Sequence, residues 1–283
     1  RPLLVRGEPG TGKSQLARAA AEQLGRLFVA EVVHSRSESQ DLQYHFDAVG
    51  RLGEAQALGH VCRQEKEVRE KLAPINFLSP GPLWWVFDWQ KAEEQYKQCP
   101  HHYPRPEPPK DWQQEQGAVL LIDEIDKADA DLPNGLLETL GNGSFPVPYL
   151  QEAVGMNNTT VPLVIITTNE ERELPPAFVR RCLVLHLRLP KEEQEFCSFL
   201  MKRGEHHFGS GCSKEVMSKA AELLWADRAE ARRQGETPPG QAEYLDMLRA
   251  LSRLAPEDPQ QQKNLLETVA EYALKKYADL DEE

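Results

Sequence analysis

Residues 7–14 read GEPGTGKS, which has the P-loop spacing G-x-x-x-x-G-K-[ST]. Glycines let backbone N–H groups approach phosphate oxygens closely, and a following helix adds partial positive charge at its N-terminus. We expect Lys13 to reach the β- and γ-phosphates of ATP, and the Ser14 hydroxyl to ligate Mg²⁺. A glycine turn that precedes a helix by chance is the alternative. The candidate nucleotide-binding residues are Gly7, Glu8, Pro9, Gly10, Thr11, Gly12, Lys13, Ser14 and Gln15.

Two adjacent acids follow the apolar run VLLI far downstream of this loop. In a P-loop protein, the first acid at such a strand end orients Mg²⁺ through its water shell, which assigns Asp123 to the metal together with Ser14. The second acid, Glu124, is a candidate general base that would activate the attacking water. An ordinary acidic turn at a strand end remains the alternative.

Two further sites could act on a nucleotide. Asn169 ends the run LVIITTN, where its amide could hold the attacking water or sense the γ-phosphate, although asparagine also commonly starts a turn. Arg180 and Arg181 end a short predicted helix. Either could be an arginine finger that a neighbouring subunit inserts to stabilise the transferring phosphoryl group. Alternatively, they only cap the helix, since positive charge is favoured at a helix C-terminus.

Short apolar runs separated by helical or turn sequence must position these residues. This alternation predicts an α/β fold with a parallel sheet, the three-layer arrangement of P-loop NTPases. The expected strands are 3–5, 26–34, 119–123, 163–169 and 183–187. From Pro190 onward only helices are expected, punctuated by Gly and Pro, over about 192–206, 213–233, 241–254 and 260–277. We therefore predict a nucleotide-binding αβα domain at 1–189 and a helical lid domain at 190–283.

Residues 41–116 form a predicted insert within the first domain. A helix start is expected at Ser39, because polar residues precede apolar spacing there. A charged helix is expected within 60–73, and the proline-dense stretch 99–111 is expected to be a loop.

Composition narrows the class of protein. The 283 residues suffice for two domains, and no apolar stretch approaches the roughly 20 residues of a membrane span. Five scattered cysteines without a C-x-x-C pair indicate a reducing cytoplasm. The net charge of −12 argues against a general nucleic-acid binder. Two His/Cys groups lack regular zinc spacing, so solvated loop histidines are the favoured interpretation of Cys99, His101, His102, His206, His207 and Cys212.

The order of these motifs resembles the AAA+ ATPases, and the details are most similar to the MoxR group. The general resemblance is carried by GEPGTGKS, LLIDEIDKAD, IITTN and LPPAFVRRC, followed by a helical domain. The MoxR likeness is carried by SQDLQYHFDAV, GPLWW, DLPNGLLETLGNGSFPVP and NEERELPPAFVRRC, so that the resemblance covers nearly the whole chain.

The resemblance implies a homo-oligomeric ring, expected to be a hexamer, with ATP held between subunits. It implies that Arg181 is the finger, with Arg180 as a second contact. It also implies a chaperone-like role on a protein substrate or on a partner with a von Willebrand A domain, with contacts in the insert.

Two departures from the family pattern stand out. AAA+ lids usually carry an arginine near the start of their third helix, whereas TPPGQAEYLDML has none between Arg233 and Arg249. Either that function is lost or another cation replaces the arginine. The segment that normally precedes the first strand and helps hold adenine is also missing, and the abrupt start at Arg1 suggests a chain trimmed from a longer one.

Three functions stay open. The first is an ATPase that remodels a partner protein. The second is an ATP-binding switch, signalling or defence module with little turnover, which Glu124 disfavours. The third is a DNA-directed AAA+ motor, which the acidic charge disfavours.

Overall fold

A computed structural model describes residues 1–61, 65–99, 104–157, 160–256 and 258–274. The chain divides into two compact units. The first, here called the sheet unit, comprises Arg1–Arg6 and Ser14–Leu185. The second, the helical unit, comprises Gly7–Lys13 and His186–Glu283, so that most of the P-loop makes its contacts with the C-terminal helices. No helix in the described ranges is long and apolar enough to cross a bilayer.

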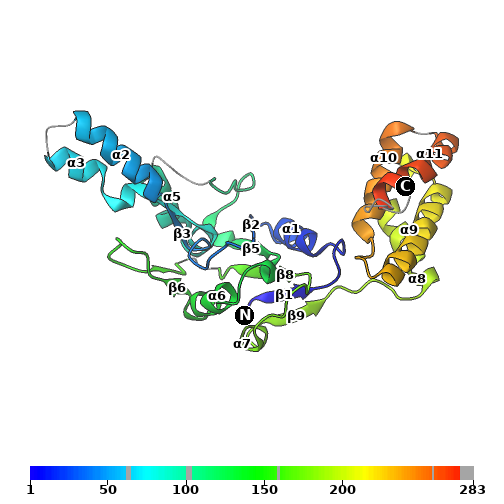
Figure 1. Ribbon diagram of the computed structural model, residues 1–283, viewed down its shortest axis with the longest axis horizontal. Coiled ribbons are helices and arrows are strands. Elements are labelled where there is room, and N and C mark those ends of the chain that lie inside the picture. Colours follow the sequence, from blue (N-terminus) through cyan, green and yellow to red (C-terminus); the bar gives the residue numbers. More distant parts are fainter. Residues whose placement is uncertain (62–64, 100–103, 158–159, 257, 275–283) are drawn as a thin grey trace, which may run out of the picture. The chain divides into compact units, whose positions relative to one another are not determined.

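A five-stranded sheet organises the sheet unit, in the order β2-β5-β8-β1-β9. Strands β2/β5, β5/β8 and β8/β1 pair in parallel. The apolar runs of β5 and β8 and the centre of β1 are almost fully buried, as expected for strands covered on both faces, whereas β2 alternates buried and exposed residues. Figure 1 shows α1 on one side of this sheet and α6 and α7 on the other. The strands are β1 Leu3–Arg6, β2 Leu27–Val32, β5 Ala118–Asp123, β8 Leu163–Thr168 and β9 Leu183–His186.

The register of the sheet decides which residues share an edge. Arg6 at the end of β1 pairs with Thr168 at the end of β8, and Asp123 ends β5 opposite Val32. The carboxyl ends of the three central strands therefore lie at one edge, where ligands of open parallel sheets bind. The helices of this unit outside the insert are α1 Lys13–Leu24, α6 Asp131–Asn142 and α7 Pro176–Val179, with a 3₁₀ turn η3 at Ile125–Lys127 and a small hairpin of β6 Ser144–Phe145 and β7 Val154–Gly155.

The predicted helix start at Ser39 is wrong. Residues after it form turns and then β3, which pairs antiparallel with β4, and the first helix begins at Ala48. Asp47 caps this helix by accepting a 2.7 Å bond from the N–H of Gly50. Tertiary pairing with 78–80 overrides the local polar-to-apolar pattern. The elements of this region are β3 Tyr44–Phe46, α2 Ala48–Val61, α3 Glu65–Lys71, η1 Pro74–Phe77, β4 Leu78–Pro80, α4 Pro82–Phe87, α5 Trp89–Gln98 and η2 Gln114–Gln116.

Within the described residues, four α-helices follow β9 and enclose a core of their own. Ser213 caps α9 by accepting a bond from the N–H of Val216, and Gly235 ends it at φ 75°, as glycine does at helix C-termini. The expected α/β fold with a parallel sheet and a helical C-terminal region is thus confirmed. The proline-dense stretch holds no regular element within 104–111; its residues 100–103 lie outside the described ranges. The elements are α8 Glu193–Phe208, η4 Gly209–Gly211, α9 Lys214–Gln234, α10 Gln241–Leu254 and α11 Pro259–Leu274.

Candidate active site

Ser14 and Asp123 meet at the carboxyl edge of the sheet. The Ser14 hydroxyl lies 2.9 and 2.8 Å from the two carboxylate oxygens of Asp123, although 109 positions separate the two residues. The fold produces this contact because α1 starts directly after β1 and Asp123 ends a strand of the same sheet. A hydroxyl and a carboxylate are the oxygen ligands that Mg²⁺ accepts, so this pair fits the ion.

Thr167 is a partner that the sequence analysis missed. Its hydroxyl donates a 2.5 Å hydrogen bond to Asp123 and accepts one of 2.9 Å from the N–H of Glu124. Thr167 is fully buried on β8, so it fixes the rotamer of Asp123 and the backbone of the next residue at once. The signal available in the sequence was a hydroxyl two residues before Asn169, on a strand next to β5.

Glu124 is held by two side chains. Its backbone is left-handed, at φ 59° and ψ 47°, a conformation that non-glycine residues adopt rarely and often at functional sites. Asn169 Nδ2 donates to one carboxylate oxygen over 3.2 Å, and Lys127 Nζ donates to the other over 2.5 Å. The hydrogen bond to Glu124 raises the pKa of Lys127, so the ammonium stays charged throughout the neutral range. The structure therefore brings the predicted base and the predicted sensor together, and adds a cation.

Asp126 fixes the loop that carries Asn169. Its carboxylate, almost fully buried, accepts bonds from the N–H groups of Asn169 at 3.3 Å and Glu171 at 2.9 Å. This third acid of the DEID run was also missed, because its partners follow a different strand. Its effect is to place the amide of Asn169 beside Glu124.

Residues Gly7 to Lys13 of the P-loop lie in the helical unit, whereas Gln15 belongs to the sheet unit. The Lys13 ammonium is buried and donates to the carbonyls of Gly7 at 2.7 Å and Glu8 at 3.0 Å. Gly10 and Gly12 have φ angles of 74° and 91°, which a residue with a Cβ adopts only under strain. Thr11 bonds back to the carbonyl of Glu8, whereas Pro9 and Gln15 are exposed. A lysine bonded to backbone oxygens, on a loop turned by glycines, has the charge to bind phosphate oxygens in place of those carbonyls.

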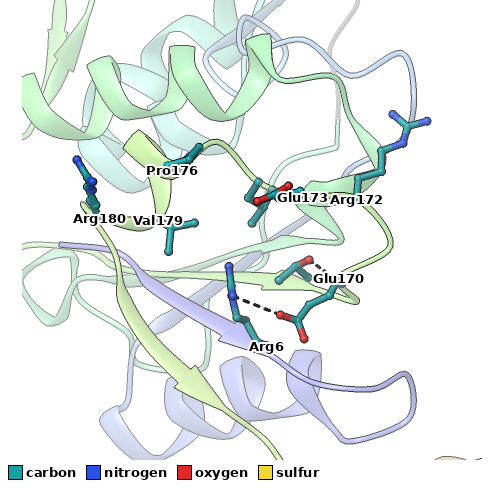
Figure 2. Close-up of a pocket in the computed structure, with 9 residues that line it drawn as sticks. Arg6, Glu170, Arg172, Glu173, Pro176, Val179 and Arg180 are labelled. Carbon is teal, nitrogen blue, oxygen red and sulfur yellow. Dashed lines mark hydrogen bonds and ion pairs between the residues drawn. The ribbon is translucent and has the colours of Figure 1, made fainter.

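Arg180 and Arg181 lie apart from the other predicted site residues. Both are exposed at the end of α7, and neither forms an ion pair within the described ranges. Arg180 lines a cavity of about 520 Å³ at the carboxyl edge, together with Arg6, Thr168 and Glu170. Figure 2 shows Arg180 at one end of this cavity and Arg172 at the other, with the Arg6–Glu170 ion pair of 3.3 Å between them.

The two His/Cys groups considered in the sequence analysis form no metal site among the described residues. Among the described residues, no cluster of three or more His, Cys, Asp or Glu side chains could hold an ion. His101 and His102 lie outside those residues. Described cysteines that are free of disulfides are Cys99, Cys182, Cys197 and Cys212.

A family profile agrees with this geometry. A sequence profile described as "AAA domain (dynein-related subfamily)" matches residues 2–182. Among solved structures, the chain resembles a candidate ATPase from Cytophaga hutchinsonii at 15% sequence identity and a TM-score of 0.41, over 93% of this chain and 74% of that one. A comparison with curated proteins finds no significant match.

Proposed function

Because the chain belongs to the AAA domain family, dynein-related subfamily, we propose that it hydrolyses ATP and uses the energy to remodel a partner protein. The contact that carries this proposal is the bond between Ser14 and Asp123, beside which Glu124 meets Asn169. A phosphate loop, a metal-orienting acid, a base and a polar sensor are the parts that nucleotide hydrolysis requires.

Each side chain has a step in the proposed reaction. Lys13 leaves its two backbone carbonyls and binds the β- and γ-phosphates. Ser14 and Asp123 would hold Mg²⁺, which would supply charge neutralisation at the phosphates. Glu124 takes a proton from the attacking water while Asn169 orients that water, and Thr167 and Asp126 keep both groups in place.

Lys127 competes with the water for Glu124, because its ammonium occupies one oxygen of the base. Lys127→Met is expected to raise ATP turnover by up to about fivefold, since a partly exposed ion pair is worth at most about 1 kcal/mol. Steady-state phosphate release measures the change. Lys219→Met is the matched control, because Lys219 forms an equally spaced pair with Glu222 on the surface of α9. A fall in turnover beyond about tenfold would assign Lys127 a transition-state role instead.

We further propose that the chain works as a MoxR-like ring, expected to be a hexamer, with a protein substrate or a partner bearing a von Willebrand A domain. Support comes from the exposure of Arg180 and Arg181, which leaves their guanidinium groups accessible to a neighbouring subunit's ATP. The sequence resemblance assigns Arg181 as the finger and Arg180 as the second contact.

Mixing two inactive variants tests the ring. Lys13→Ala protein keeps Arg181 but cannot bind ATP, whereas Arg181→Ala protein binds ATP but lacks the finger. Each alone is expected to be nearly inactive, and subunits mixed before nucleotide is added should recover part of the turnover, because some sites then combine an intact P-loop with an intact arginine. Phosphate release measures the recovery, and native mass spectrometry verifies mixed rings.

If verified mixed rings stay inactive, Arg181 is not the finger and Arg180 becomes the candidate. A mere helix cap predicts a different result for Arg181→Ala. Stability would fall by a few tenths to about 1 kcal/mol, with hydrolysis per folded molecule unchanged.

A further inference from the structure

The P-loop packs closely against the C-terminal helices within the helical unit. A Cβ on Gly7 would lie 2.5 Å from the carbonyl oxygen of Leu187, so the two backbones touch there. A Cβ on Gly10 would lie 3.5 Å from both the Cα of Gly240 and the Cβ of Ala242, at the start of α10. Within this unit, the loop proposed to bind phosphate therefore contacts the C-terminal part of the chain directly at two glycines.

Glu8 adds an electrostatic contact between these two points. Arg228 of α9 donates from Nη2 to one carboxylate oxygen of Glu8 over 2.6 Å. Arg232, one turn later, lies 3.6 Å from the other oxygen. Glu8 is not a phosphate ligand in the proposed mechanism, since the loop binds phosphate through backbone N–H groups and Lys13. Its carboxylate can therefore pair with the arginines of α9 without losing a phosphate contact.

Arg228 is built into the helical core. Its side chain is only 2% exposed, and its guanidinium lies over the ring of Phe196 at 5.2 Å. Nη1 donates to the carbonyl of Pro239, and Nε has no hydrogen-bond partner in the part of the chain that the structure describes. Removing the counter-charge of a buried cation is strongly unfavourable, so Arg228 holds Glu8 tightly.

We infer that the Glu8–Arg228 pair is a tether through which the occupancy of the P-loop changes the C-terminal part of α9 and the start of α10. The inference rests on the proposed binding of ATP. Phosphates beside Glu8 repel its carboxylate and attract the arginines, and Lys13 gives up the carbonyls of Gly7 and Glu8. Both changes act on Glu8 and therefore on Arg228.

AAA+ lids usually carry an arginine near the start of their third helix, which is α10 in this chain. The tether supplies a cation that could stand in for it. Gln241 occupies the first position of α10, where no cation is present. Arg228 supplies a cation from the preceding helix, and it reaches the P-loop through a protein carboxylate. It is thus a positioning residue, because it acts on the nucleotide through Glu8.

Hydrogen exchange on the full chain tests the tether, using Glu8→Gln, which keeps the size of the side chain and removes its charge. In the wild type, saturating ATPγS with Mg²⁺ should change amide exchange in peptides covering 226–243 by at least about fivefold. In Glu8→Gln the change should fall below about twofold at an ATPγS concentration that calorimetry shows to saturate this variant. Glu22→Gln, an exposed acid on α1, is the matched control and should respond like the wild type.

Glu8→Asp keeps the charge and should restore part of the response, which a merely destabilised variant would not do. The same Glu8→Asp comparison decides the matter if Glu8→Gln folds poorly. A wild-type response in Glu8→Gln, or no response of 226–243 in a wild type that binds ATPγS, overturns the tether and leaves the ATPase proposal intact. A wild type that does not bind ATPγS removes both proposals.

Discussion

Replacing Glu124 by glutamine is expected to slow ATP hydrolysis by about 10²- to 10⁴-fold while ATP stays bound. Glutamine keeps the size of the side chain and can still contact the amide of Asn169, but it cannot accept a proton. The ion pair with Lys127 is lost as well, which has only a small effect because both partners are partly exposed. Single-turnover hydrolysis and calorimetry measure the two quantities separately.

The control for this variant is Glu138→Gln, an exposed acid on α6 that should leave turnover unchanged. Turnover within about threefold of wild type, roughly 0.65 kcal/mol in barrier, would refute the assignment of Glu124 as the base. The same measurement separates the proposed ATPase from an ATP-binding switch. In a switch the wild type itself turns over slowly, so the variant and the wild type would differ little.

Lys13→Ala should abolish detectable ATP binding, which corresponds to a loss of at least about 100-fold in affinity, or roughly 2.8 kcal/mol. Lys13 is the side-chain cation assigned to the β- and γ-phosphates, and charge-assisted bonds to phosphate are among the strongest in proteins. The fold should persist, because two of the bonds lost in the free protein go to carbonyls of the P-loop itself. Calorimetry measures affinity, and thermal melting verifies the fold.

Lys202→Ala is the control, since Lys202 is exposed on α8 and far along the chain from the P-loop. Wild-type affinity in a folded Lys13→Ala protein would remove the phosphate-binding interpretation of GEPGTGKS altogether. Reduced affinity in both variants would instead indicate a general effect of lost positive charge. Such an effect should become smaller at high salt, because salt screens long-range attraction between the protein and ATP.

Local patterns were enough to predict much of this protein. The P-loop spacing lies within eight residues, and its glycines meet a backbone requirement that needs no distant partner. The apolar runs around Val5, Ile122 and Ile166 identified buried strands, because a strand covered on both faces must be apolar throughout. Parallel strands place their carboxyl ends together, and Asp123 and Asn169 each stand at the carboxyl end of a predicted strand.

Only the tertiary structure decided which partners complete the site. Thr167 and Asp126 belong to the same motifs as the predicted residues, but their roles depend on the register between β5 and β8. The contact of Lys127 with Glu124 is local, three positions along the chain. The segment Tyr44–Phe46, where a helix was expected after Ser39, likewise became a strand because distant residues 78–80 pair with it.

The contact between Glu8 and Arg228 shows the limit most clearly. The two residues are 220 positions apart, and no sequence motif around either one predicts the other as its partner. A sequence records spacing along the chain, and spacing fixes periodicity, turns and helix caps. A buried charge, by contrast, is matched by whichever opposite charge the folded chain places beside it, so its partner is known only once the fold has formed.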